Sequence, residues 1–255
     1  MGFPVFPLEW KSPQGEISHG YREDGYIPEA FVNLLALLGW NPGTEQEIFS
    51  MDELINLFSL ERVNKSGARF DPEKAKWFNH QYLIKQPNNQ IAKQFAPVLQ
   101  TKGVAFDMEK VEKIVALVKE RVSLVSELWG QASFFFESPQ TYDEKTVSKF
   151  WTVDTPTIMN EVAIKSALSA QAAAPKIMNE VANRIETVEP YAAEEVEQAI
   201  KGYISDNGHG MGKVMNAIRL SLVGEPKGPG VADICELLGK EETVNRLRKA
   251  AKTLG

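Results

Sequence analysis

The chain has 255 residues and a formal net charge of −6; 43% of its residues are hydrophobic and 24% are charged. A chain of this length can bury a core and commonly forms two domains. No apolar run approaches the roughly 18–20 residues of a membrane-spanning helix, and the N-terminus lacks the features of a secretory signal, so we expect a cytoplasmic protein. The acidic balance argues mildly against nucleic-acid binding unless a local basic patch provides it.

Three helices are predicted in the first hundred residues from the signals at their ends. Pro28 in the first turn and Gly39 as a left-handed stop bound a helix that is apolar nearly all round, which predicts burial on most sides. Ser50 and Glu53 form a capping box for a second helix, and Asp71 caps a third. Strand-like alternation of any length is missing from the sequence, so the fold class is predicted to be all-α with two helical domains.

One long amphipathic helix is predicted over residues 107–129, with Asp107 as its cap. Its apolar stripe recurs at steps of three and four. The stripe consists of Val111, Ile114, Val115, Val118, Val122, Val125 and Trp129. Arg121 falls at the edge of this stripe.

The domain boundary is predicted near residue 105, because breaks in the pattern occur at residues 86–89 and 101–103. The chain is thus divided into residues 1–16, 17–105 and 106–255, with a possible further break near residue 205. Later helices are predicted after Pro156, after Pro175, and over residues 193–204, 213–223, 231–238 and 241–254. Residues 158–163 return letter for letter as 177–182, which indicates two similar helices rather than a solenoid.

Signals for catalysis are weak throughout the sequence. The three histidines are far apart and fit no metal-ligand spacing, and the lone Cys235 excludes a thiolate cluster and is expected in the core. Residues 208–213 are glycine-rich but do not fit a phosphate loop, so a turn between two helices is the better interpretation. A small-molecule enzyme that uses this loop stays open as a further alternative.

Arginines give the more informative polar signal. Arg121 and Arg219 each lie among apolar residues, where an arginine commonly extends its stem along the core. The same placement would also hold the planar guanidinium group, with its two parallel N–H donors, against a nucleotide base. Residues 240–252 form a local basic segment, for which a solvated helix face is the commoner explanation.

Long motifs of this sequence resemble the bacterial-type glutamyl-tRNA synthetases. Residues 20–43 read GYREDGYIPEAFVNLLALLGWNPG and residues 58–68 read FSLERVNKSGA, followed by FDPEK and WFN. Residues 212–224 read GKVMNAIRLSLVG, followed by GPG at 228–230 and LGKE at 238–241. The resemblance covers roughly residues 17–255, thins between about 150 and 200, and does not include residues 3–16. Class I lysyl-tRNA synthetases carry a similar helical region, but residues 28–43 favour the glutamyl family.

The resemblance implies a stem-contact domain followed by a helical anticodon-binding cage, and therefore a tRNA(Glu) partner. Arg121 resembles the family arginine that reads the third anticodon base and is linked to rejecting the glutamine tRNA. The family's remaining anticodon contacts have counterparts in this sequence, which are Asn216, Arg219, Gly228, Pro229, Gly230 and Val231. Lys65 and Ser66 resemble a family turn to which we assign a stem or phosphate contact.

The resemblance also implies which parts are missing. The catalytic nucleotide-binding fold of the family, with its HIGH-like and KMSKS-like motifs, has no recognisable counterpart, so ATP and Mg²⁺ would bind a catalytic domain outside this chain. The chain alone is expected to bind no cofactor, to be monomeric and not to aminoacylate, and that catalytic domain would be its other partner. The alternative is an all-α protein-interaction module derived from a synthetase, which would have no need of Arg121 and Arg219.

Overall fold

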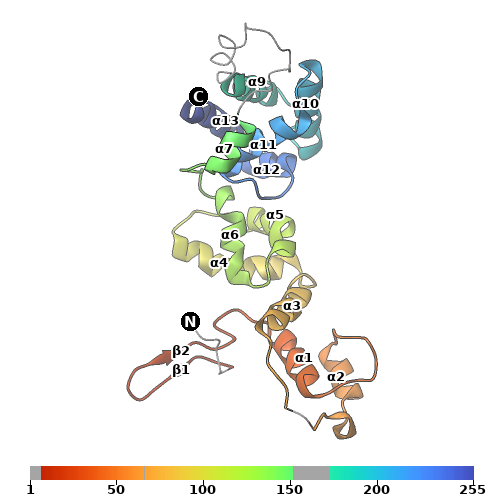
Figure 1. Cartoon of the computed structure of the whole chain (residues 1–255). Helices are drawn as coiled ribbons and strands as arrows, with labels where there is room; N and C mark the ends of the chain where they lie inside the picture. The colour runs from red at the N-terminus through yellow and green to blue at the C-terminus, as the bar shows by residue number, and fades with distance from the viewer. Residues whose placement is uncertain (1–6, 66, 152–172) are drawn as a thin grey trace. The chain divides into compact units, whose positions relative to one another are not determined.

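The computed structural model describes residues 7–65, 67–151 and 173–255 (Figure 1). It divides into two compact units, Met1–Gln131 and Ala132–Gly255. Within the described residues, helices dominate and the strands are limited to one short hairpin, which confirms the all-α prediction. The division between residues 131 and 132 gives a second possible boundary, while the boundary near residue 105 stays a prediction.

The first unit begins with an antiparallel hairpin in which Trp10 lies opposite Ser18. Its elements are β1 (Trp10–Lys11), β2 (Ile17–Ser18), α1 (Pro28–Gly39), α2 (Met51–Leu57), η1 (Leu60–Arg62), α3 (Pro72–Leu83), α4 (Asn88–Lys102), α5 (Met108–Val118), η2 (Lys119–Arg121), η3 (Val125–Glu127) and α6 (Leu128–Ala132), which runs to the division. Helix α1 packs on α3 and α2, and α4 packs on α5. Leu34 and Phe78 are buried between α1 and α3.

The helix starts of this unit follow the predicted capping. The backbone N–H of Glu53 donates to the Ser50 hydroxyl over 3.2 Å, and the Ser50 N–H donates back to the Glu53 carboxylate over 2.7 Å. Asp71 accepts from the N–H groups of Glu73 and Lys74 at the start of α3. Each side chain satisfies amide donors that have no partner within the first helical turn.

Helix α1 differs from its prediction in its end and in its burial. Gly39 is its last residue and is not left-handed; Trp40 follows in an extended conformation and forms a bridge with Val63. Trp40 is buried, so packing of the indole sets the chain direction here. Val32 and Leu35 are exposed, so the prediction that α1 is buried on most sides is wrong.

The prediction of one helix over residues 107–129 is also wrong. Asp107 caps α5 as expected, but α5 ends at Val118, and residues 122–124 are not helical. Two side chains of helix α3 contact the non-helical residues 122–124. The Asn79 side chain donates to the carbonyl of Ser123, and Nδ1 of His80 lies 2.7 Å from the carbonyl oxygen of Val122. These contacts, made by residues more than forty positions earlier, replace hydrogen bonds of a continuous helix.

The second unit is a helical bundle, and each of its longer helices buries apolar side chains. Its elements are η4 (Ser133–Phe135), α7 (Glu144–Phe150), α9 (Ala173–Glu186), α10 (Ala193–Asp206), α11 (Met211–Val223), α12 (Val231–Leu238) and α13 (Lys240–Leu254). Helix α13 packs on α9 and α11, and α10 packs on α9 and α12. The helices predicted after Pro175 and over residues 193–204, 213–223, 231–238 and 241–254 are confirmed. The helix predicted after Pro156 and the first copy of the six-residue echo lie outside the described residues.

Arg246 joins several elements of this bundle, and Cys235 packs in its core. The Arg246 guanidinium donates to the carbonyls of Phe134 and Leu222 over 2.6 and 2.8 Å. Cys235 is fully buried, as predicted, and its burial raises the pKa of the thiol to about 12. An arginine with this many donors joins η4, α11 and α13 at one point.

Candidate nucleic-acid interface

Most of the predicted anticodon-binding residues meet at α11 and the loop that follows it. Asn216 and Arg219 lie three positions apart on α11, a spacing that places two side chains on neighbouring parts of one helix face. Arg219 Nη1 donates to the carbonyl oxygen of Pro229. The helix and the loop of the predicted site are therefore joined directly.

The loop between α11 and α12 depends on glycines at points of close approach. Gly224 ends α11 in the left-handed region, and a Cβ there would come within 2.8 Å of the Thr141 carbonyl oxygen. Gly228 has a φ of +133°, and a Cβ there would come within 3.3 Å of Nη1 of Arg219. A side chain at either position would disturb the loop, which explains these two glycines.

The residues that lead into α12 offer backbone groups rather than side chains. Gly230 is the N-cap residue of α12, and Val231 is the first residue of that helix. Pro229 and Val231 are buried, and Gly228 and Gly230 have no side chain. Any ligand at residues 228–231 would thus bind to N–H and carbonyl groups of the loop.

Asn216 is partly committed to its own helix. Its Nδ2 donates to the carbonyl of Gly212 over 2.7 Å, one turn earlier. The side chain of Asn216 is half-buried. Its amide can accept a hydrogen bond while this donor remains engaged.

Arg121 lies in the first unit, on the last residue of η2. The turn is held by Lys119, whose Nζ donates to the carbonyls of Ile84 and Gln86 over 3.0 and 3.4 Å. Arg121 itself is exposed, and no hydrogen bond or ion pair joins its guanidinium to another described residue. The backbone of this turn is thus fixed, and the guanidinium group of Arg121 presents its N–H donors to solvent.

The predicted stem contact is described only in part. Lys65 is exposed and follows η1 in the first unit, whereas Ser66 lies outside the described residues. Lys65 belongs to the first unit, and the α11 residues belong to the second. The stem or phosphate role of this pair stays a prediction.

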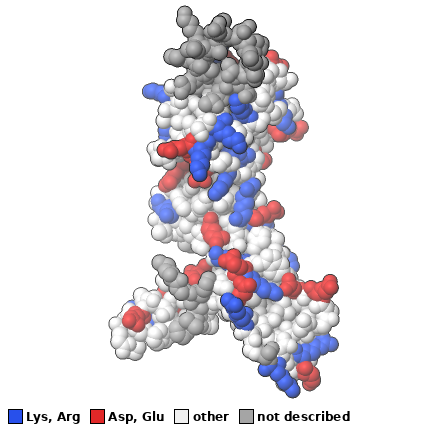
Figure 2. Space-filling view, in the orientation of Figure 1, with Lys and Arg blue, Asp and Glu red and all other residues white. Residues whose placement is uncertain are grey.

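The basic segment at residues 240–252 is largely used within the second unit. Arg246 is buried, Arg248 pairs with Glu186, and Lys240 pairs with Glu189. Basic and acidic side chains are interspersed on the face shown in Figure 2. Arg248, Lys249 and Lys252 are exposed, as a solvated helix face predicts, whereas the buried Arg246 departs from that interpretation.

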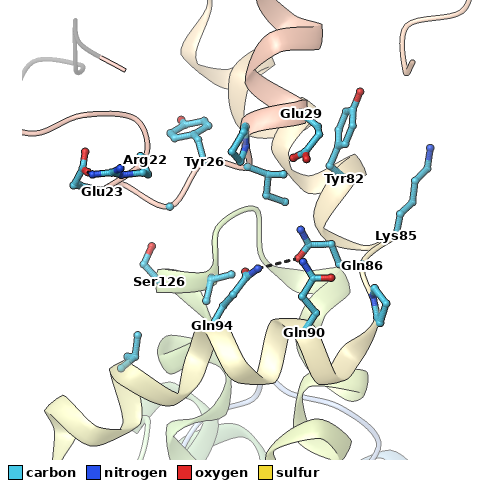
Figure 3. Close-up of a pocket in the computed structure, with 16 residues that line it drawn as sticks. Arg22, Glu23, Tyr26, Glu29, Tyr82, Lys85, Gln86, Gln90, Gln94 and Ser126 are labelled. Atoms are coloured by element: carbon cyan, nitrogen blue, oxygen red, sulfur yellow. Dashed lines mark hydrogen bonds and ion pairs between the residues drawn. The ribbon is translucent and has the colours of Figure 1, made fainter. Parts of the chain in front are cut away.

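A pocket in the first unit was not indicated by the sequence analysis. It has a volume of about 800 Å³. Gln86, Gln90 and Gln94 line it at steps of four, and Gln94 donates to Gln86 (Figure 3). Tyr26 and Tyr82 also line it, and burial raises the pKa of Tyr82 to about 12. The spacing of the glutamines at steps of four was the signal in the sequence. Arg22, Glu23, Glu29 and Lys85 also line the pocket, so it presents charged as well as neutral groups.

The described residues show little else that could support catalysis. They contain no group of three or more His, Cys, Asp or Glu side chains arranged to hold a metal ion. Residues 207–210 form a turn between α10 and α11 with Gly208 at a φ of +63°, which confirms the interpretation of the glycine-rich stretch. None of the described helices is both long and apolar enough to span a membrane.

Comparison with protein families gives two matches. Residues 90–251 match the anticodon binding domain, and residues 11–77 match the catalytic domain of class I tRNA synthetases (E and Q). The expectation that the catalytic domain has no counterpart in this chain is therefore wrong, because residues 11–77 match part of that domain.

Relatives match the chain from end to end, residues 1–16 included. The glutamate–tRNA ligase of Porphyromonas gingivalis is 51% identical over 100% of the chain and 47% of its own length. The glutamate–tRNA ligase of Flavobacterium johnsoniae is 49% identical over 100% of the chain and 46% of its own length. The chain thus spans about half the length of these relatives.

A crystal structure of a glutamate tRNA ligase from Elizabethkingia meningosepticum, in complex with its amino acid, superposes with a TM-score of 0.88. That enzyme is 44% identical, and the match covers 100% of this chain and 47% of the other. The family match over residues 90–251 extends across more than half of the chain. The chain therefore belongs to the anticodon-binding domain family, and the resemblance to part of a glutamyl-tRNA synthetase is confirmed.

Proposed function

We propose that this chain is the tRNA-binding part of a glutamate–tRNA ligase and that it recognises the anticodon and stem of tRNA(Glu). The observation that carries the proposal is the direct bond between Arg219 and the Pro229 carbonyl within the segment that matches the anticodon binding domain. This bond holds a helix face and a loop of backbone groups together. Splayed anticodon bases are read by such combinations of side-chain and backbone hydrogen bonds.

The two arginines would have different roles. Arg121 is exposed on a fixed turn, so its fork is available to bond the edge of one base. Arg219 donates to Pro229, so it would position the loop for the RNA. Asn216 and the backbone of residues 228–231 would provide the remaining contacts, and Lys65 and Ser66 a contact to the stem.

Catalysis would require the part of the relatives that this chain does not span. There we place the sites for ATP and Mg²⁺, and we expect the isolated chain to be monomeric and not to aminoacylate. Its partners would be tRNA(Glu) and the catalytic domain of its own full-length protein. No specific feature favours the alternative of a protein-interaction module without tRNA recognition.

Substitution of Arg121 tests the proposal with little risk to folding, because the side chain is exposed. Arg121→Ala should weaken binding to tRNA(Glu) by about 1–3 kcal/mol and relax discrimination at one base. Arg121→Lys is the matched control: it keeps the charge but loses the fork, so it should retain the salt dependence of binding and lose the discrimination. Fluorescence anisotropy with labelled tRNA measures both. An Arg121→Ala variant that binds and discriminates like the parent chain would refute this role.

A further inference from the structure

Exposed large apolar side chains are concentrated in one stretch of the chain. Fourteen are exposed among the described residues, and twelve of these lie between residues 8 and 77. The other two, Met108 and Met211, stand apart on α5 and α11. Single exposed apolar residues are ordinary on a protein surface, whereas a concentrated group marks an interaction surface.

Helix α2 shows this exposure most clearly. Met51, Leu54, Ile55 and Phe58 follow at steps of three and four, so they form one apolar stripe along the helix. Only Leu54 is buried, in a cluster with Trp40, while Ile55 is 68% exposed. An amphipathic helix ordinarily turns such a stripe towards a core. Met51 and Phe58 are 40% and 47% exposed, although the Phe58 ring also packs on Trp40 with the ring centroids 5.6 Å apart.

The apolar surface continues past the end of α2. Leu60 in η1 is 78% exposed, and Val63 is also exposed. The polar residues of α2 lie on its other side, where Asp52, Glu53 and Asn56 are exposed. We define the α2 apolar face as Met51, Ile55, Phe58, Leu60 and Val63.

We propose that the α2 apolar face is the surface on which the remainder of the class I catalytic domain docks. The proposal rests on the proposed function and adds the surface through which this chain would join the enzyme. Residues 11–77 match the catalytic-domain model, and they contain the whole α2 apolar face. The relatives have more than half of their length outside the matched region. Apolar side chains that pack against the other parts of a complete domain are exposed to solvent in a segment that does not include those parts.

The test compares this chain with a full-length chimera in which it replaces the corresponding 47% of the Porphyromonas gingivalis ligase. Hydroxyl-radical footprinting measures the oxidation rates of Met51, Phe58 and Leu60 in both proteins. We expect these rates to fall several-fold in the chimera. The rate at Met108, which is exposed but lies outside residues 11–77, should stay unchanged. Equal rates at the α2 apolar face in the two proteins would overturn the proposal.

A second measurement uses the melting temperature. Ile55→Glu should lower the Tm of the chimera and leave the Tm of the isolated chain unchanged, because the substituted side chain is exposed only in the latter. Met108→Glu is the matched control, since Glu suits the first turn of a helix, and it should leave both Tm values unchanged. If Ile55→Glu has the same effect on both proteins, the face does not dock on the catalytic domain.

A second copy of the chain is the competing occupant. Sedimentation velocity of the isolated chain distinguishes it: a dimer that Ile55→Glu converts to a monomer would assign the face to self-association and overturn the proposal. Binding of tRNA(Glu) separates this inference from the proposed function. Ile55→Glu should bind the tRNA like the parent chain, whereas a parent chain that fails to bind would refute the proposed function without changing the footprint comparison.

Discussion

Two arginines of α13 lie two positions apart and have opposite surroundings. Arg246 is 3% exposed and donates to two buried carbonyls, whereas Arg248 is half-exposed and pairs with Glu186. In the sequence both belong to one basic segment, and no local pattern separates them. The difference arises because α13 packs on α11, which brings the Leu222 carbonyl to Arg246.

Replacement of these arginines should therefore have unequal effects. Arg246→Ala leaves the carbonyls of Phe134 and Leu222 buried without donors, and each such loss costs about 1–3 kcal/mol, so we expect a loss of about 3 kcal/mol or more in unfolding free energy. Arg248→Ala removes a surface ion pair and should cost about 0–1 kcal/mol. Urea unfolding followed by circular dichroism measures both. Equal losses for the two variants would show that Arg246 does not fix the bundle.

At the level of elements, the capped helix starts were predictable, whereas the break in the helix predicted over residues 107–129 was not. Ser50, Asp71 and Asp107 cap the helices for which the sequence analysis proposed them, because a cap is decided by a few adjacent residues. The break after Val118 depends on Asn79 and His80, which no local pattern connects to it. Helix α4 was also not predicted, and it contains Pro97, a residue that argues against a helix interior.

For the same reason the site was predictable only in part. The motif letters indicated Arg219 and the glycine loop, but the bond from Arg219 to Pro229 depends on how the loop folds back. Arg121 was placed on a continuous helix, yet it lies on a turn held by Lys119. Its exposure follows from that turn, which the periodicity of the sequence could not indicate.

The caps also predict a dependence of stability on pH. The pKa of Glu53 is lowered by hydrogen bonds from the backbone and hydroxyl of Ser50, and the pKa of Asp143 by those from the hydroxyl and backbone N–H of Thr146. A carboxyl group with a lowered folded pKa stabilises the fold above its unfolded pKa. The contribution is lost as the pH falls through the folded value.

Unfolding free energy should thus decline as the pH falls below about 4.5, the ordinary value for Glu53. Glu53→Gln removes one of the titrating groups and should decline less steeply over the same range. Urea unfolding at a series of pH values measures both proteins. The assignment to Glu53 is wrong if the variant and the parent chain decline in parallel.

Across the whole chain, two features point to a part of a larger enzyme. One is the family match, which joins an anticodon binding domain to a segment of a catalytic-domain model. The other is the concentration of exposed apolar residues in that same segment, which the sequence analysis could not anticipate because exposure depends on the packing of α1, α2 and α3. Anticodon recognition would then use Arg121 and the α11 residues, whereas docking on the rest of the enzyme would use the α2 apolar face.

The most direct test of the account is binding of this chain to tRNA(Glu) and to the same tRNA with a changed third anticodon base, across a series of salt concentrations. Both affinities should fall as salt rises, because phosphate contacts contribute to each complex. The native anticodon should bind more tightly, by about 1–3 kcal/mol, at every salt concentration. Equal affinity for the two tRNAs throughout the series would contradict anticodon recognition by this chain.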